Sequence, residues 1–151
     1  MKEGRPWLVH FALLSILILA ADQGTKWLAV RDLAAGRSVP VIGPALHLTL
    51  VHNRGTAFGI IPNWTPSLLA AAIALSVAVL LYNRHFLGRH LLVSLALALQ
   101  LGGAAGNLLD RLCKGYVVDF VDLHVWPVFN LADVAITIGV ILLLWHLIRT
   151  R

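Results

Sequence analysis

Apolar residues are concentrated in four long runs, separated by shorter segments that are richer in polar residues, glycine and proline. A membrane-spanning helix requires about 20 mostly apolar residues, within a range of roughly 17–25. We therefore expect four membrane-spanning helices, at residues 8–30, 66–82, 91–109 and 131–148. The tryptophans lie close to the ends of these runs, as in an aromatic belt at headgroup depth: Trp7, Trp27, Trp64, Trp126 and Trp145.

The segment between the first two runs has a different pattern. It alternates leucine with other residues, with Leu46, Leu48 and Leu50 set against His47, Thr49 and Val51. A period of two is typical of strands. The predicted fold is an all-α membrane protein, a four-transmembrane-helix bundle with a small extracytoplasmic β-sheet between helices 1 and 2. Because the four runs occupy more than half of the chain, we expect a single domain over residues 1–151.

Composition agrees with a membrane protein, since 59% of the residues are hydrophobic, 13% are charged and the mean hydropathy is +0.83. Such a chain is too apolar for an ordinary soluble domain. Lys2 and Arg5 before the first run would also suit a cleavable signal peptide, but the run continues past Asp22, which favours an uncleaved helix.

The net charge of +5 comes from scattered basic residues without a nucleic-acid-binding motif, so we expect no nucleic-acid partner. These residues are better explained as topology signals. They are dense in the two tails and in the turn at 83–90, and sparse in the longer loops on the other side. The positive-inside rule then places both termini in the cytoplasm.

Polar side chains on three of the runs are placed toward one membrane face. With the first and third helices running outward and the fourth inward, Asp22, Asp110 and Asp133 lie near the non-cytoplasmic face, and Asp119 lies in the short loop between the third and fourth helices. Ionisable residues within a membrane are costly and usually functional. Helical spacing gives three stripes that we expect to enclose a polar pocket: Ser15, Asp22 and Lys26; Gln100, Gly103, Asn107 and Asp110; Asn130, Asp133 and Thr137.

Each acid also has a purely structural explanation. Asn130 and Asp133 have the spacing of a capping box, and Asp22 and Lys26 form an i, i+4 pair. Asp119 would be a turn residue and Asp122 an exposed loop acid. These explanations do not account for several acids and asparagines gathered at one depth, and this gathering favours a functional site.

Several kinds of chemistry are disfavoured by the sequence. No serine lies in a GxSxG context, Cys113 has no neighbouring histidine in the sequence, and no HExxH motif is present. We therefore expect neither a covalent nucleophile nor a metal or other cofactor. Two carboxylates that share a proton can deprotonate a water molecule and donate a proton to a carbonyl oxygen.

Five motifs in order resemble those of the lipoprotein signal peptidases, signal peptidase II. They are "DQGTK" at 22–26, "NRGTAFG" at 53–59, "GGAAGNLLDR" at 102–111, "VVDF" at 117–120 and "FNLAD" at 129–133, and they span nearly the whole chain. The resemblance implies an intramembrane aspartic protease of the bacterial inner membrane. Such an enzyme removes the signal peptide from diacylglyceryl-modified prolipoproteins by cutting before the lipidated cysteine.

The resemblance also implies roles for individual residues. Asp119 and Asp133 would be the catalytic pair, and the remaining motif residues would bind the substrate or support the site: Asp22, Lys26, Asn53, Gly55, Asn107, Asp110, Arg111 and Asn130. The expected partners are lipid-modified prolipoprotein signal peptides and membrane lipid, and the expected state is a monomer with its active site near the extracytoplasmic face.

Two other classes of function are compatible with parts of the pattern. Intramembrane acids also mark the pathways of small proton- or ion-coupled transporters, but such a path needs polar residues at both membrane faces, and the inner halves of these runs are almost purely apolar. A noncatalytic helix-bundle subunit would explain the packing but not the polar stripes.

Overall fold

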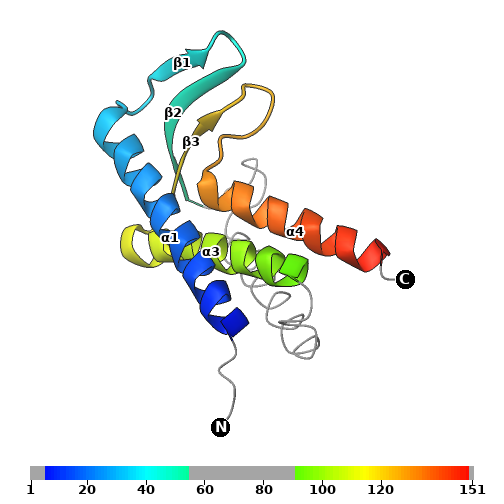
Figure 1. Cartoon of the computed structure of the whole chain (residues 1–151). Coiled ribbons are helices and arrows are strands. Elements are labelled where there is room, and N and C mark those ends of the chain that lie inside the picture. The colour runs from blue at the N-terminus through cyan, green and yellow to red at the C-terminus, as the bar shows by residue number, and fades with distance from the viewer. Residues whose placement is uncertain (1–5, 55–90, 150–151) are drawn as a thin grey trace.

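The computed structural model describes residues 6–54 and 91–149, which form helices around one end of a small sheet (Figure 1). The helices are α1 (Pro6–Asp32), α3 (Leu91–Lys114) and α4 (Leu131–Arg149), and the strands are β1 (Ser38–Ile42), β2 (Leu46–Asn53) and β3 (Val117–Asp122). The expected helix at 66–82 and the expected site residue Gly55 lie outside the described residues.

The helices form where the apolar runs predict them. By length and composition α1 and α3 could each cross a membrane, and α4 contains a shorter apolar stretch from Leu131 to His146. Helix α3 was expected to end at residue 109, but it continues to Lys114. Asp110 therefore lies inside the helix and not at its end. The helix stops at Gly115, whose φ of 77° suits glycine and whose N–H bonds the carbonyl of Arg111 at 3.0 Å.

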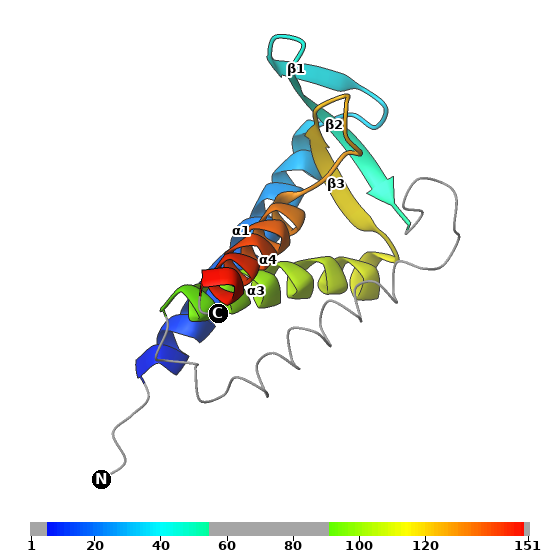
Figure 2. The same cartoon turned by 90° about the vertical axis from the view of Figure 1, so that its right-hand side faces the viewer.

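Helix α3 packs against both α1 and α4, as the two perpendicular views show (Figures 1 and 2). Two adjacent glycines of α3 permit this close packing, one against α1 and the other against α4. A Cβ atom on Gly102 would lie 2.6 Å from the carbonyl oxygen of Ser15 in α1, and one on Gly103 would lie 2.6 Å from that of Ala132 in α4. Small residues let helix backbones approach closely in this way, so α3 is the central helix of the described part of the bundle.

The sheet is antiparallel, with the order β1-β2-β3. Strands β1 and β2 lie between the first two expected helices, as predicted, but the third strand comes from the segment between α3 and α4. The prediction that Asp119 lies in a loop was therefore wrong, because Asp119 is in β3 and pairs with Val51 of β2. The register shifts between Leu48 and Val51, and such bulges bend a strand and redirect its side chains next to active sites.

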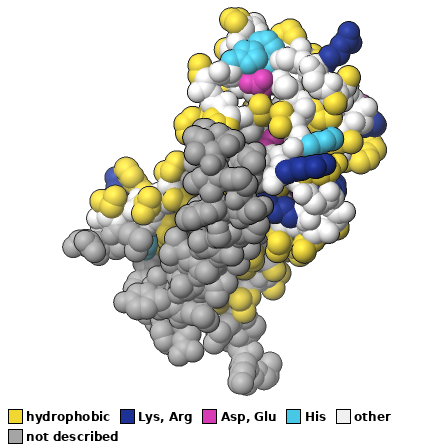
Figure 3. All heavy atoms as spheres, turned by 180° about the vertical axis from the view of Figure 1, so that it is seen from behind, with side chains coloured by type: hydrophobic (Ala, Val, Ile, Leu, Met, Phe, Trp, Pro, Cys, Tyr) yellow, Lys and Arg dark blue, Asp and Glu magenta, His cyan; other side chains and the backbone are white. Residues whose placement is uncertain are grey.

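Apolar side chains are exposed on the helices and charged side chains are buried between them, which is the opposite of the arrangement in a soluble protein. Large apolar side chains on α1 and α4 are exposed, for example Leu17 at 62% and Ile141 at 59%, whereas Asp22 and Lys26 are completely buried. In the view of Figure 3, most visible histidine and basic side chains lie in the upper half of the face, and apolar side chains dominate its described surface below. An apolar exterior around buried charges is expected of helices in contact with lipid.

Candidate active site

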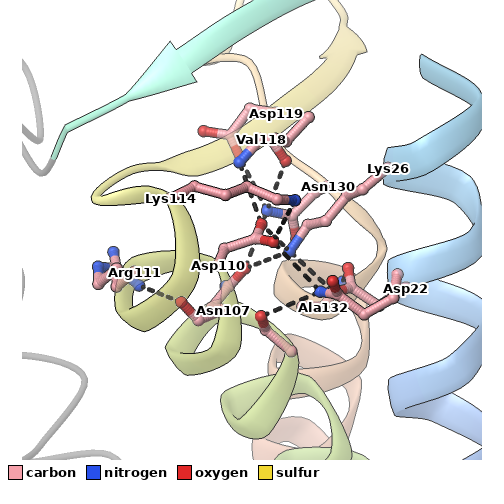
Figure 4. Close-up of polar contacts among 12 residues, drawn as sticks. Asp22, Lys26, Asn107, Asp110, Arg111, Lys114, Val118, Asp119, Asn130 and Ala132 are labelled. Carbon is pink, nitrogen blue, oxygen red and sulfur yellow. Dashed lines mark hydrogen bonds and ion pairs between the residues drawn. The ribbon is translucent and has the colours of Figure 1, made fainter. Parts of the chain in front are cut away.

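A polar cluster lies where α1, α3, β3 and the start of α4 meet (Figure 4). Asp119 of β3 is buried here, and residues of all three predicted stripes converge here and are buried with it: Asp22, Lys26, Asn107, Asp110 and Asn130. The expectation that polar residues of the first, third and fourth predicted helices gather in one place is therefore confirmed for the described part of the chain.

Lys26 is the centre of the cluster. Its Nζ atom lies 2.8 Å from Oδ2 of Asp22 and 2.9 Å from Oδ2 of Asp110, and it donates to Oδ1 of Asn107 at 2.8 Å. An ammonium group has three protons to donate, so these acceptors use all of them. A buried charge is tolerated when it is paired and hydrogen-bonded in this way. The predicted i, i+4 pair of Asp22 and Lys26 is confirmed.

Asp22 joins α1 to both other helices. Its Oδ1 atom accepts the N–H of Ala132, 3.0 Å away, which is one of the amides at the start of α4 that have no partner within the helix. Gly106 of α3 lies so close that a Cβ atom there would run into the Asp22 carboxylate. Gln23 adds a second link, because its Nε2 atom donates to the Gly106 carbonyl at 3.2 Å and to Oδ1 of Asp110 at 3.3 Å.

Asp110 attaches β3 to α3. Its Oδ2 atom accepts the N–H of Val118 at 3.2 Å, and its Oδ1 atom lies 2.8 Å from Nζ of Lys114. Sequence reasoning did not select Gln23 or Lys114. Both left a signal in the sequence, since Lys114 lies four residues after Asp110 on the same helical face and Gln23 lies beside Asp22 in the first motif.

Asp119 is 2% exposed and is held by two carboxamides. Its Oδ1 atom accepts from Nδ2 of Asn130 at 2.7 Å, and its Oδ2 atom accepts from Nδ2 of Asn53 in β2 at 2.9 Å. Burial raises the pKa of Asp119 to about 6, and the nearby charge of Asp133 acts in the same direction against the two amide donors. Asp119 can therefore hold a proton at a pH where an exposed aspartate is ionised.

Asp133 lies in the first turn of α4 and forms the predicted capping box. The N–H of Asp133 bonds Oδ1 of Asn130 at 3.0 Å, and the N–H of Asn130 bonds Oδ2 of Asp133 at 3.2 Å. The other carboxylate oxygen, Oδ1, accepts from Nδ2 of Asn107 at 2.8 Å. The capping role and membership of the polar cluster are thus both present.

Asn130 connects the two acids. Its side chain donates to Asp119 while its backbone N–H donates to Asp133. Asn130 Nδ2 also lies 3.1 Å from Oδ1 of Asn107 and 3.3 Å from the Val118 carbonyl. Four N–H donors therefore hold the two carboxylates, and two of these donors belong to the same asparagine, Asn130.

Arg111 lies at the edge of the cluster. Its Nη1 atom donates to the Asn107 carbonyl at 3.2 Å, and its charge interacts with those of Asp119 and Asp133. An arginine has five N–H donors, and only this one hydrogen bond of Arg111 is seen among the described residues. Arg111 therefore lies next to the two acids, with most of its donors unused by the described residues.

Ser15 and Thr137 of the predicted stripes lie apart from the cluster. The hydroxyl of Ser15 bonds the carbonyls of Phe11 and Ala98, at 3.0 and 3.3 Å, and ties α1 to α3 elsewhere. Thr137 is exposed and lines a groove of about 340 Å³, together with Leu123, Trp126, Phe129, Asp133, Val134 and Ile138. This mostly apolar groove reaches Asp133 from the outside of α4.

Asp122 is not the exposed loop acid that the sequence suggested. It is buried at the end of β3, where Oδ2 accepts from the hydroxyl of Thr49 and Oδ1 from the N–H of His124, both at 2.8 Å. The His124 N–H, followed by Thr49, lowers the pKa of Asp122. Because β3 pairs with β2, this acid fastens the sheet and lies apart from the cluster.

Among the described residues, no group of three or more histidine, cysteine, aspartate and glutamate side chains could hold a metal ion. The thiol of Cys113 is exposed and lies inside α3, beyond the expected helix end at residue 109. The reactive groups that this part of the chain brings together are therefore carboxylates.

Comparisons with known proteins agree with this class of site. The family model of signal peptidase (SPase) II matches residues 14–149. The lipoprotein signal peptidase of Moorella thermoacetica is 49% identical over 138 residues, covering 91% of this chain and 92% of that protein. A solved structure described as a bacterial membrane enzyme superposes with a TM-score of 0.75 at 30% identity, over 93% of this chain and 88% of the other, and a second one with a TM-score of 0.72 at 31% identity, over 91% and 92%.

A membrane-embedded aspartic peptidase is the class that these findings define. The chain belongs to the signal peptidase II family, the lipoprotein signal peptidases. The expected resemblance is confirmed, and the transporter and the noncatalytic helix bundle are excluded as its function.

Proposed function

We propose that Asp119 and Asp133 are the catalytic pair with which this peptidase removes signal peptides from diacylglyceryl-modified prolipoproteins, cutting before the lipidated cysteine. The observation that carries the proposal is the pair of carboxylates held by four N–H donors and joined through Asn130. Neither acid belongs to the hydrophobic clusters of the described residues. Asp119 lies in β3 and Asp133 in the first turn of α4, and the start of α4 lies next to the sheet (Figure 1).

The chemistry follows from one shared proton. Two neighbouring carboxyl groups do not both ionise readily, so one remains protonated at a pH where the other is a carboxylate. The carboxylate takes a proton from a water molecule as that water attacks the scissile carbonyl carbon, and the carboxylic acid donates its proton to the carbonyl oxygen. The raised pKa of Asp119 suits it to hold the shared proton before the reaction.

The other predicted residues support the pair or contact the substrate. Asn53, Asn107 and Asn130 orient the carboxylates, and Arg111 is available to bind a substrate carbonyl. Asp22, Lys26 and Asp110 hold the three helices and β3 together. Gly55 keeps its proposed role next to the site on the strength of its motif alone.

The apolar surroundings of the pair suit a substrate that arrives from the bilayer. The groove beside α4 leads to Asp133, and exposed apolar residues continue from it along the helix, including Ile138, Ile141 and Leu144. A signal peptide or an acyl chain could move along this surface without leaving an apolar environment. This supports entry from the side of the bundle.

We further propose a monomeric, single-domain enzyme over residues 1–151 in the bacterial inner membrane, with four membrane-spanning helices. The start of α1 and the end of α4 both lie away from the sheet (Figure 2), which supports placing both termini in the cytoplasm and the acids near the extracytoplasmic face. The density of basic residues in the tails gives the same orientation.

The test is cleavage of a matched pair of precursors by the purified chain in lipid nanodiscs. One precursor carries a diacylglyceryl cysteine and the other has the same sequence without lipid. We expect cleavage of the lipidated precursor only, and no cleavage of either by Asp133→Asn. Equal cleavage of both precursors would contradict the lipoprotein assignment, and full activity of the variant would contradict the assignment of the acid.

A further inference from the structure

Two asparagine carboxamides, those of Asn107 and Asn130, present their NH₂ groups to the two acids, and a carboxamide can be rotated by half a turn without changing its shape. The orientation must therefore be set by other partners. For Asn130, the N–H of Asp133 binds Oδ1 and leaves Nδ2 directed at Asp119. For Asn107, the contacts of Oδ1 decide which group faces Asp133.

Lys26 is the charged partner of Asn107. Its ammonium group donates to Oδ1 of Asn107 at 2.8 Å, while Nδ2 of the same carboxamide donates to Oδ1 of Asp133 at 2.8 Å. In the rotated carboxamide an NH₂ group would face the ammonium, and a carbonyl oxygen would face a carboxylate. Both contacts would be repulsive, so a single cation on α1 determines that Asp133 on α4 receives a donor.

Two carboxylates fix the position of the Lys26 ammonium group. Asp22 and Asp110 accept its two remaining protons, and the lysine side chain is fully buried, so the ammonium cannot turn away to water. Asn130 also donates to Oδ1 of Asn107, at a longer distance of 3.1 Å. Charge-assisted hydrogen bonds are roughly twice as strong as neutral ones, so Lys26 is the dominant partner.

We propose that Lys26 is a positioning residue for catalysis, which acts by holding the Asn107 carboxamide with its NH₂ group toward Asp133. This inference rests on the proposed function of the acid pair. It assigns Lys26 more than the structural support of the helices, because a support role requires only its two ion pairs and not the third hydrogen bond. Lys26 makes no hydrogen bond to either acid among the described contacts, although its charge interacts with both of them. The orienting effect that we assign to Lys26 therefore runs through Asn107.

The test is a double-mutant cycle of Lys26→Met and Asn107→Leu, with kcat and KM measured for the lipidated precursor. Each single change should lower kcat on the order of 100-fold, the cost of a small misplacement at a reacting group, with KM nearly unchanged. If Lys26 acts through Asn107, adding Lys26→Met to Asn107→Leu should change kcat by no more than about 2-fold. Multiplying losses would overturn the proposal and indicate that the lysine charge acts on the acids directly.

Lys114→Met is the matched control, because Lys114 also binds Asp110, at 2.8 Å, but makes no contact with Asn107 among the described residues. If Lys114 supports the cluster without orienting Asn107, the loss of kcat from Lys114→Met should multiply with that from Asn107→Leu. Thermal unfolding in detergent reports whether each variant is folded. Should Lys26→Met alone fail to fold, Lys26→Met combined with Asp22→Asn removes one buried cation and one buried anion together, and the same cycle is run against Asp22→Asn.

The two levels of inference fail in different ways. Absence of cleavage by the unmodified enzyme would contradict the proposed function itself. If the unmodified enzyme cleaves the precursor, two results would contradict only the role of Lys26. One is full activity of folded Asn107→Leu, and the other is losses of kcat that multiply when Lys26→Met and Asn107→Leu are combined.

Discussion

Replacing Asp119 with asparagine separates the chemistry of the acid pair from its contribution to the fold. The change conserves shape but converts one carboxylate oxygen into an NH₂ group. Both oxygens of Asp119 accept from carboxamide NH₂ groups, those of Asn53 and Asn130, so the variant places a donor against a donor at one of them. One hydrogen bond is lost, which costs about 1 kcal/mol and up to ~3 kcal/mol if the group remains unsatisfied.

The expected loss of rate is larger than this cost in stability. A carboxamide at this position can neither take a proton from water nor hold the shared proton, and positioned acid–base groups contribute roughly 10²–10⁴-fold each. Loss of both actions of the pair should lower kcat by at least about 10³-fold, which corresponds to about 4 kcal/mol of transition-state stabilisation. A destabilisation of about 1 kcal/mol lowers the unfolding temperature by only roughly 2–4 °C in a chain of this size.

The assay is turnover of a lipidated precursor by Asp119→Asn, by Asp133→Asn and by the double variant, with precursor binding and thermal unfolding measured in parallel. The three variants should be equally inactive, because residues that act as one unit give losses that do not multiply. Binding should persist, since Arg111 and the carboxamides remain. Retention of a tenth or more of the activity by Asp133→Asn would refute the reasoning and leave Asp133 as a helix cap only.

Two further predictions concern proton binding and packing. Because the folded protein raises the pKa of Asp119 to about 6 from the ordinary 3.8, its contribution to stability is complete below the ordinary value and is lost as the pH rises through about 6. Turnover should likewise decline as the pH rises above the apparent pKa values of the pair, and a constant rate from about pH 5 to about pH 9 would contradict a shared proton. Gly106→Ala should displace the Asp22 carboxylate and lower the unfolding temperature of the protein. Gly24→Ala should not lower it, because a Cβ atom at Gly24 would meet no other atom, and thermal unfolding of both variants checks this.

The sequence predicted the described helices and the gathering of acids from α1, α3 and α4, because both depend on local patterns. The assignment of Asp119 and Asp133 as a pair came instead from the motifs that resemble signal peptidase II. Apolar runs of sufficient length define α1, α3 and α4 within a few residues. The acids could be grouped because helix direction and the 3.6-residue period determine the depth and face of Asp22, Asp110 and Asp133. The capping box at Asn130 and Asp133 is also local, and its geometry is present as its spacing predicts.

The third strand could not be predicted from local pattern. Residues 117–122 alternate weakly, in a short segment between two helices, and they form a strand because β2 supplies a partner from a distant part of the chain. The same pairing buries Asp122 and places Asp119 beside Asn53, so both errors about these acids have one cause. The orientation of Asn107 likewise depends on contacts from three helices, which no single segment encodes.

The charges of the cluster give an independent reason for one retained proton. The described residues bring together four carboxyl groups, Asp22, Asp110, Asp119 and Asp133, and three basic groups, Lys26, Arg111 and Lys114. With every group ionised, the cluster would carry one uncompensated negative charge in surroundings of low polarity, where isolated charges are strongly disfavoured. One proton on the acid pair makes the charges equal. Asp22 and Asp110 are in direct contact with lysines, whereas Asp119 and Asp133 are held by neutral N–H donors, so we assign the proton to the second pair. In our proposed mechanism, the packing that neutralises the cluster then also provides the acid and the base of peptide hydrolysis.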